Sequence, residues 1–158
     1  MAKETKTNAM RILDRLKIAY ELNLYTCEEF HDAVQIADML AQPYECSFKT
    51  LVAKGKSGGH YVFVIPIAEE VDLKAAAVAV GEKSVALIPV KDITALTGYV
   101  RGGVSPLGMK KVFPTVIDSR AESFERIIIS GGRLGAQIFL SPQDLAGAVG
   151  AHFAPICA

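Results

Sequence analysis

The segment from Gly98 to Lys111, GYVRGGVSPLGMKK, constrains the fold and function of this chain more than any other stretch. It holds four glycines and three cations, and no acidic residue, inside a chain that is 51% hydrophobic. The adjacent Gly102 and Gly103 permit positive φ angles and let a ligand approach the main chain closely. Consecutive N–H groups in such a turn converge on an anion or a developing oxyanion. A flexible connection is the commoner role of a glycine-rich loop, but the length and charge of this one favour a binding loop.

Composition indicates one compact domain over residues 1–158. A chain of 158 residues buries roughly two thirds of its unfolded surface. The 17 Lys+Arg residues balance 17 Asp+Glu, which argues against a general nucleic-acid coat and leaves room for a local basic patch. No stretch is apolar and long enough to span a membrane, and no secretory signal is recognisable. With an odd number of cysteines (Cys27, Cys46 and Cys157), we expect reduced thiols and a cytoplasmic protein.

Helical and strand patterns mix along the chain and predict an α+β fold. Helical spacing or capping indicates helices over residues 8–16, 33–40, 73–80 and 91–96, and one that begins at Ser141-Pro142. Alternation or short apolar runs indicate strands over residues 20–25, 48–53, 61–67, 84–88, 115–117, 126–130 and 136–140. Asp72 and Gly81 are the predicted ends of the alanine-rich helix.

Several sequence blocks occur in one order and resemble a known family. They are Phe48-Lys49-Thr50-Leu51, the run GYVRGGVSPLGMKK, Pro114-Thr115-Val116-Ile117-Asp118 and Ile129-Ser130-Gly131-Gly132. Together they resemble the YbaK/EbsC family of aminoacyl-tRNA deacylases, which is related to the editing insertion of bacterial prolyl-tRNA synthetase. The glycine run is more similar to the cysteine-directed branch than to the alanine- or serine/threonine-directed branches. The resemblance implies a mixed, partly closed β-barrel wrapped by helices.

The resemblance also implies a substrate and a mechanism. The substrate is a mischarged tRNA, most closely Cys-tRNA(Pro), with Cys-tRNA(Cys) as a second candidate and prolyl-tRNA synthetase as a candidate partner. The substrate thiol attacks its own ester carbonyl, so the protein supplies positioning and stabilises the developing charge. No enzyme nucleophile, metal or cofactor is needed, and the sequence holds no metal, nucleotide or flavin fingerprint.

Lys49 is the first candidate catalytic residue. By pattern alone, a lysine in an apolar strand lies at an edge with its ammonium in water. The resemblance instead places Lys49 in the pocket, where its charge holds the ribose, the terminal phosphate or the ester carbonyl. We do not predict that it acts as a general base.

The candidate substrate-binding residues lie in two glycine pairs and at one tyrosine. The main chain of Gly102, Gly103, Val104 and Ser105 is expected to form the surface against which the aminoacyl group lies. Gly131 and Gly132 resemble the family's second glycine pair, and Tyr25 corresponds to a tyrosine near the pocket, although an ordinary aromatic at the barrel rim fits it equally well. Gln137 is neutral, so a carboxylate role at that position is in doubt. Ser105 lacks a nucleophile-elbow context and is expected to satisfy the loop main chain.

Other titratable residues form no convincing site. Cys27 and His31 have helical spacing, but two ligands do not make a zinc site. Cys46 is close to Lys49 in sequence, and a lysine that contacts a thiol lowers its pKa. A small, buried and unreactive cysteine is nevertheless the commoner case. Two further functions stay open: a water-using deacylase directed at Ala or Ser/Thr on tRNA(Pro), and a non-catalytic module that binds the aminoacyl end.

Overall fold

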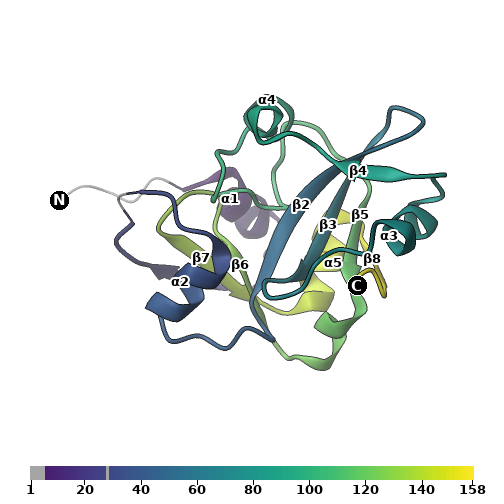
Figure 1. The fold of residues 1–158 in the computed structure, drawn as a ribbon. Helices are drawn as coiled ribbons and strands as arrows, with labels where there is room; N and C mark the ends of the chain where they lie inside the picture. Colours follow the sequence, from purple (N-terminus) through teal and green to yellow (C-terminus); the bar gives the residue numbers. More distant parts are fainter. Residues whose placement is uncertain (1–5, 28) are drawn as a thin grey trace.

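The computed structural model describes residues 6–27 and 29–158 (Figure 1). In chain order the elements are α1 (Asn8–Arg15), β1 (Glu21–Leu24), α2 (Ala33–Met39), β2 (Phe48–Gly55), β3 (His60–Pro66), α3 (Leu73–Val80), β4 (Val85–Leu87), η1 (Val90–Asp92), α4 (Ile93–Thr97), β5 (Thr115–Asp118), η2 (Ser119–Ser123), β6 (Ile127–Ser130), β7 (Ala136–Leu140), α5 (Pro142–Val149) and β8 (His152–Ala154). The α+β class is confirmed. The 3₁₀ helix η2 and strand β8 were not predicted from the sequence.

The helices begin and end where local side chains satisfy the main chain. Asp32 and Gln35 form a reciprocal capping box at the start of α2. Asp72 caps α3, and Gly81 ends it in the left-handed conformation, at φ 74°. Ser141 caps α5. Within the described residues, no helix is long and apolar enough to cross a membrane.

The strands form one five-stranded and one three-stranded sheet. The larger has the order β4-β2-β3-β5-β8, in which β5 runs parallel to β3 and β8 while β2 pairs antiparallel with β3 and β4. The smaller has the antiparallel order β1-β7-β6. A parallel bridge between Ser47 and Ile128 joins the two sheets where β2 begins. The mixed sheet is therefore confirmed, whereas the partly closed barrel stays a prediction, because the described strands show no ring of pairs that closes.

Strand β1 exists as predicted, but its apolar side chains remain exposed. Leu22 and Leu24 are 38% and 41% exposed, whereas Asn23 is half-buried and contacts Gln137. Leu22 is opposite the buried Ile138 and Leu24 is opposite the buried Ala136, so both lie on the core face of the small sheet. They stay accessible because β1 is the edge strand of that sheet.

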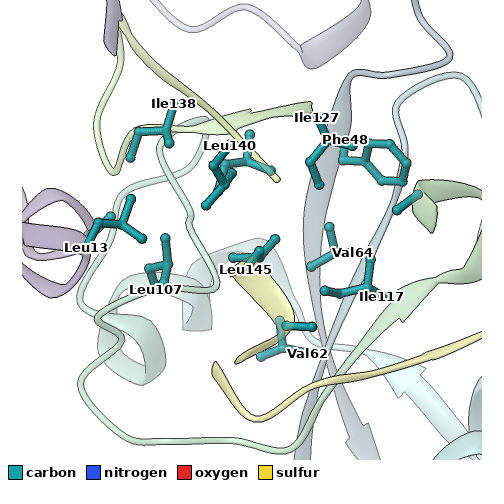
Figure 2. Close-up of a cluster of buried hydrophobic side chains, with 14 of the residues drawn as sticks. Leu13, Phe48, Val62, Val64, Leu107, Ile117, Ile127, Ile138, Leu140 and Leu145 are labelled. Atoms are coloured by element: carbon teal, nitrogen blue, oxygen red, sulfur yellow. The ribbon is translucent and has the colours of Figure 1, made fainter. Parts of the chain in front are cut away.

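The main hydrophobic core lies between the two sheets (Figure 2). Leu13 of α1 and Leu107 of the glycine loop meet Ile138 and Leu140 of β7 and Leu145 of α5, while Phe48, Val62, Val64 and Ile117 come from the large sheet. Leu107 is fully buried in this cluster. The core therefore anchors one end of the glycine loop as well as both sheets. A second core cluster, which includes Phe63 and Ile65, lies on the other face of the large sheet with α3.

Candidate functional site

A cleft of about 340 Å³ lies where β2, β6 and β7 approach α2 and the glycine loop. This volume is in the range of sites that hold small ligands. Most of its lining is apolar. The residues that line it are Tyr25, Phe30, His31, Asp32, Ala33, Ile36, Ala37, Gln42, Ser47, Phe48, Lys49, Thr50, Leu51, Val52, Ile67, Leu87, Ile88, Val90, Ile93, Arg101, Gly102, Val104, Ile128, Ile129, Ser130, Ala136 and Gln137.

Lys49 lines this cleft from β2, as the resemblance implied. Its side chain is half-buried, and it forms no salt bridge within the described residues. Arg101 is a second cation in the lining, and its guanidinium lies 4.2 Å from the centre of the Phe30 ring. The carboxylate of Asp32 accepts the Gln35 N–H at the start of α2. The two cations therefore give the cleft a positive character that suits an anionic ligand.

The first glycine pair lies partly on the cleft. Gly102 and Val104 line it, whereas Gly103 is buried behind them. The Gly103 N–H donates to the Val100 carbonyl at 2.9 Å, so this donor is already used inside the loop. A Cβ on Gly103 would lie 2.8 Å from the Arg133 Cα. Gly103 thus allows close packing of two loops, and Gly102 faces the ligand space.

Ser105 is completely buried and does not line the cleft. Its Oγ accepts the Leu107 N–H at 3.2 Å, which is the supporting role expected from the sequence. The Tyr99 hydroxyl donates to the Leu107 carbonyl, and the Tyr99 N–H donates to Thr97 Oγ1. These contacts hold the loop from beneath.

Gly131 and Gly132 do not line the cleft either, although the neighbouring Ser130 does. A Cβ on Gly131 would lie 2.9 Å from the Ala136 Cβ. Gly132 has φ +97°, and a Cβ there would lie 2.9 Å from Thr7. The second glycine pair therefore permits the tight connection between β6 and β7 and its contact with the N-terminal segment.

Tyr25 lines the cleft, and its main-chain N–H donates to the Gly135 carbonyl at 2.9 Å. Burial raises the pKa of its phenol above the ordinary value. The structure places no metal site at the two residues with helical spacing, since Cys27 and His31 do not share a helix.

Among the described residues, no group of three His, Cys, Asp or Glu side chains is placed to hold a metal ion. Burial raises the pKa of Cys46, so a thiolate activated by Lys49 is not supported.

An amide cluster that was not predicted from the sequence lies at the cleft. Gln42 and Gln137 exchange two hydrogen bonds, of 2.8 and 2.9 Å, and Asn23 donates to the same Gln137 oxygen at 3.0 Å. The two glutamines are 95 residues apart. The alternation of β7 places Gln137 on the opposite face from Ala136 and Ile138, but no local signal identifies Gln42 as its partner. The cluster gives the cleft a neutral polar region where a carboxylate role was in doubt.

Comparison with known proteins identifies the family. The model of the aminoacyl-tRNA editing domain matches residues 27–148. The chain belongs to this family. A protein from Enterococcus faecalis that is assigned as a Cys-tRNA(Pro)/Cys-tRNA(Cys) deacylase, EbsC, is 42% identical over 154 residues, which cover 97% of this chain and 94% of that protein. The resemblance to the YbaK/EbsC family is confirmed, and this editing-domain protein is an aminoacyl-tRNA deacylase.

Solved structures share the fold of this editing-domain protein. The hypothetical protein APE2540 is 25% identical with a TM-score of 0.85, over 94% of this chain and 97% of that one. A structure described as a trans-editing enzyme for prolyl-tRNA synthetase is 22% identical with a TM-score of 0.79, over 98% of this chain and 99% of that one. The second likeness shows the fold alone.

Proposed function

We propose that this editing-domain protein removes cysteine from mischarged tRNA(Pro), with Cys-tRNA(Cys) as a second substrate. The observation that carries the proposal is the position of Lys49 in a mostly apolar cleft that the glycine loop also lines. The chain is 42% identical to a relative assigned as a Cys-tRNA(Pro)/Cys-tRNA(Cys) deacylase. A mischarged tRNA is the partner, bound by its aminoacylated 3′ end, and prolyl-tRNA synthetase is a candidate for delivering it. The whole chain, residues 1–158, acts as one domain in this proposal.

The reaction is an intramolecular thiol–ester exchange. The substrate sulfur forms a bond to its own ester carbonyl carbon, and the bond from that carbon to the ribose oxygen breaks. The thiol proton is finally transferred to the ribose oxygen, and the products are tRNA and a cyclic thiolactone. Such a reaction requires the thiol and the carbonyl to be held in a near-attack arrangement, which an apolar cleft provides by restricting the bound conformers.

Lys49 supplies the positive charge near the reacting ester. Because the cleft is mostly apolar, an ammonium there interacts more strongly with developing negative charge than it would in water. Arg101 at the same cleft gives a second cation for the phosphates of the acceptor end. Asp32, a carboxylate in the same lining, accepts the Gln35 N–H at the start of α2. The proposal gives it no part in the reaction, because the substrate thiol is the nucleophile.

The decisive experiment measures amino-acid release from Cys-tRNA(Pro) under multiple-turnover conditions. Ser-tRNA(Pro), Ala-tRNA(Pro) and tRNA(Pro) charged with S-methylcysteine are compared at the same concentrations. We expect rapid turnover of the cysteine ester only, because serine is nearly isosteric but is a poorer nucleophile at neutral pH. Pocket size alone gives little discrimination between near-isosteres.

Each other outcome selects a different function. Equal rates for cysteine and S-methylcysteine would point to water as the nucleophile and to an Ala- or Ser/Thr-directed deacylase. Stoichiometric binding of the aminoacyl end without turnover would make the protein a binding module. Adding prolyl-tRNA synthetase to the same assay tests the partner, since a true partner raises the rate at low tRNA concentration.

A further inference from the structure

Phe30 and Arg101 form a cation–π pair in the lining of the cleft. The Cζ atom of Arg101 lies over the Phe30 ring, 4.2 Å from its centre. Both side chains line the cleft and both are exposed, Phe30 to 40%. The other Phe and Tyr rings of the lining are less accessible, since Phe48 is buried and Tyr25 is half-buried. The pair therefore gives the cleft its most accessible benzene-ring surface.

A tight turn presents Arg101 to the cleft. The Gly103 N–H donates to the Val100 carbonyl at 2.9 Å, which closes a four-residue turn with Arg101 as its second residue. Gly102 is the third residue, and its φ of +86° is the positive value typical of that position in a type II turn. Arg101 therefore extends from a turn that the glycine and an internal hydrogen bond fix in one conformation.

Phe30 is positioned by the same turn and by the start of α2. One side of its ring packs against Gly102, where an added Cβ would lie 3.0 Å from the Phe30 Cδ1. Two residues further along the chain, Asp32 begins α2 through its reciprocal bonds with Gln35. Arg101 forms no salt bridge within the described residues, so no carboxylate there draws its guanidinium away from the ring. The two side chains are thus assembled before a ligand binds.

The substrate brings an aromatic base to this part of the cleft. In an aminoacyl-tRNA the ester and the adenine base are attached to the same ribose, the last one of the chain. When the aminoacyl group occupies the cleft beside Lys49, the adenine therefore lies within one sugar ring of the reacting ester. Unstacked bases of RNA pack on aromatic rings or on the plane of an Arg guanidinium. The exposed pair of Phe30 and Arg101 offers a surface of this kind.

We propose that the adenine base of the substrate's terminal adenosine stacks on the Arg101 guanidinium, which Phe30 supports from its other side. This inference rests on the proposed function and names the binding site of the base. A guanidinium can carry a base on its face and donate from its N–H edge at the same time. Arg101 is therefore able to stack on the base and to bind the adjoining phosphate. Leu87 and Val90, which are exposed aliphatic residues of the lining, offer neither an aromatic ring nor a guanidinium plane.

Stacking of the base would also serve the reaction. The base is held at one end of the ribose and the aminoacyl group at the other, so the ester has fewer orientations relative to Lys49. Restricting the reacting groups in this way raises the rate of an intramolecular attack. Binding energy from the base, which does not react, is then used to position the thiol and the carbonyl.

A pair of small substrates isolates the contribution of the base. One is 3′-cysteinyl-adenosine, and the other is the matching cysteinyl ester of 1,4-anhydroribitol, which has the same sugar ring and no base. We measure kcat/KM for both esters with the wild type, Arg101→Lys, Phe30→Leu and Lys91→Ala. Arg101→Lys keeps the charge and removes the planar guanidinium. Lys91→Ala is the control, since Lys91 is an exposed cation next to the lining residue Val90 but is not itself in the lining.

The wild type should prefer the adenosine ester by about 10-fold or more, the size of effect typical of one stacked base. The preference should fall toward one in Arg101→Lys and in Phe30→Leu, and should keep its wild-type value in Lys91→Ala. A preference that survives in Arg101→Lys would overturn the inference and leave the proposed function intact. Equal rates for the two esters with an active wild type would overturn it as well.

A second measurement is independent of turnover. The amide-linked analogue of cysteinyl-adenosine is added to ¹⁵N-labelled protein, and the Arg101 Nε–H proton should move upfield because the ring current of a stacked base shields it. The amide analogue without a base should leave that signal in place. No upfield shift with the adenosine analogue would overturn the inference. If the wild type releases no amino acid from any aminoacyl-tRNA, the proposed function fails, and this titration alone decides the role of Arg101.

Discussion

The hydroxyl of Tyr99 donates a hydrogen bond to the main-chain carbonyl of Leu107, and the two oxygens are 2.5 Å apart. The contact spans the glycine loop, which carries Gly102 and Val104 to the cleft. Both residues are buried, Tyr99 at 6% exposure and Leu107 at 0%. The loop is therefore closed at its base, and its cleft-facing part is held between two anchored ends.

Tyr99→Phe should destabilise the protein because the Leu107 carbonyl loses its donor in a buried position. An unsatisfied buried polar group costs about 1–3 kcal/mol. Urea unfolding measures the difference in free energy. Tyr20→Phe is the matched control, since its hydroxyl bonds to Asp14 at the surface and its loss should change stability far less. A Tyr99→Phe protein as stable as the control would show that the bond does not support the loop.

Lys49→Ala should nearly abolish deacylation of Cys-tRNA(Pro) and leave the fold intact. Loss of a charge-assisted contact present in the transition state costs on the order of 2–4 kcal/mol, a fall of about 10²–10³ in kcat/KM. Lys54→Ala removes an exposed lysine of the same strand, outside the cleft lining, and should keep wild-type activity. Full activity in folded Lys49→Ala protein would remove Lys49 from the mechanism.

Gly102→Ala should impair both the loop and the cleft. Gly102 has φ +86°, and its new Cβ would lie 2.8 Å from Leu134 and 3.0 Å from the Phe30 ring. Gly58→Ala is the control for backbone strain alone, because Gly58 has φ +96° and nothing within 4 Å of the added Cβ. We expect both variants to lose about 1–2 kcal/mol of stability from left-handed strain. A fall in kcat/KM is expected only for Gly102→Ala, and equal activity of the two would contradict a site at Gly102.

Ser105→Ala should be mild in activity and measurable in stability. The Ser105 hydroxyl accepts the Leu107 N–H in a fully buried position, so its removal costs about 1 kcal/mol. Turnover of Cys-tRNA(Pro) should stay within a few-fold of wild type because Ser105 does not line the cleft. A folded but inactive Ser105→Ala protein would instead require a role for the hydroxyl in the reaction.

Alkaline pH should destabilise the wild type more than Cys157→Ala. Burial, followed by the nearby Asp118 carboxylate, raises the pKa of the Cys157 thiol from 9.0 to about 12. Because the folded-state pKa lies above the unfolded value, this stability is complete below pH 9 and is lost as pH rises toward 12. Urea midpoints between pH 8 and 11 should fall more steeply for the wild type. Parallel curves would show that Cys157 titrates alike in both states.

Local sequence determined the elements because their determinants lie within a few residues. As predicted, α3 begins after Asp72 and ends at Gly81, and α5 begins after Ser141. The run that begins at Phe48 forms a strand, also as predicted. The order of the motifs also identified the family, since four blocks in register are read without knowing their positions in space. Each of these signals can be recognised in the sequence without a tertiary structure.

Only the tertiary structure decided which surfaces face the cleft. Gln42 and Gln137 meet although 95 residues separate them, and Leu22 and Leu24 are exposed because β1 became an edge strand. Strand β2 pairs with β4 at one end and meets β6 at the other, through the bridge between Ser47 and Ile128, and the residues between these two ends line the cleft. A sequence pattern gives the period of a strand, whereas the choice of its partner strands depends on long-range packing. In this protein that packing brings the residues from Phe48 to Val52 to the cleft.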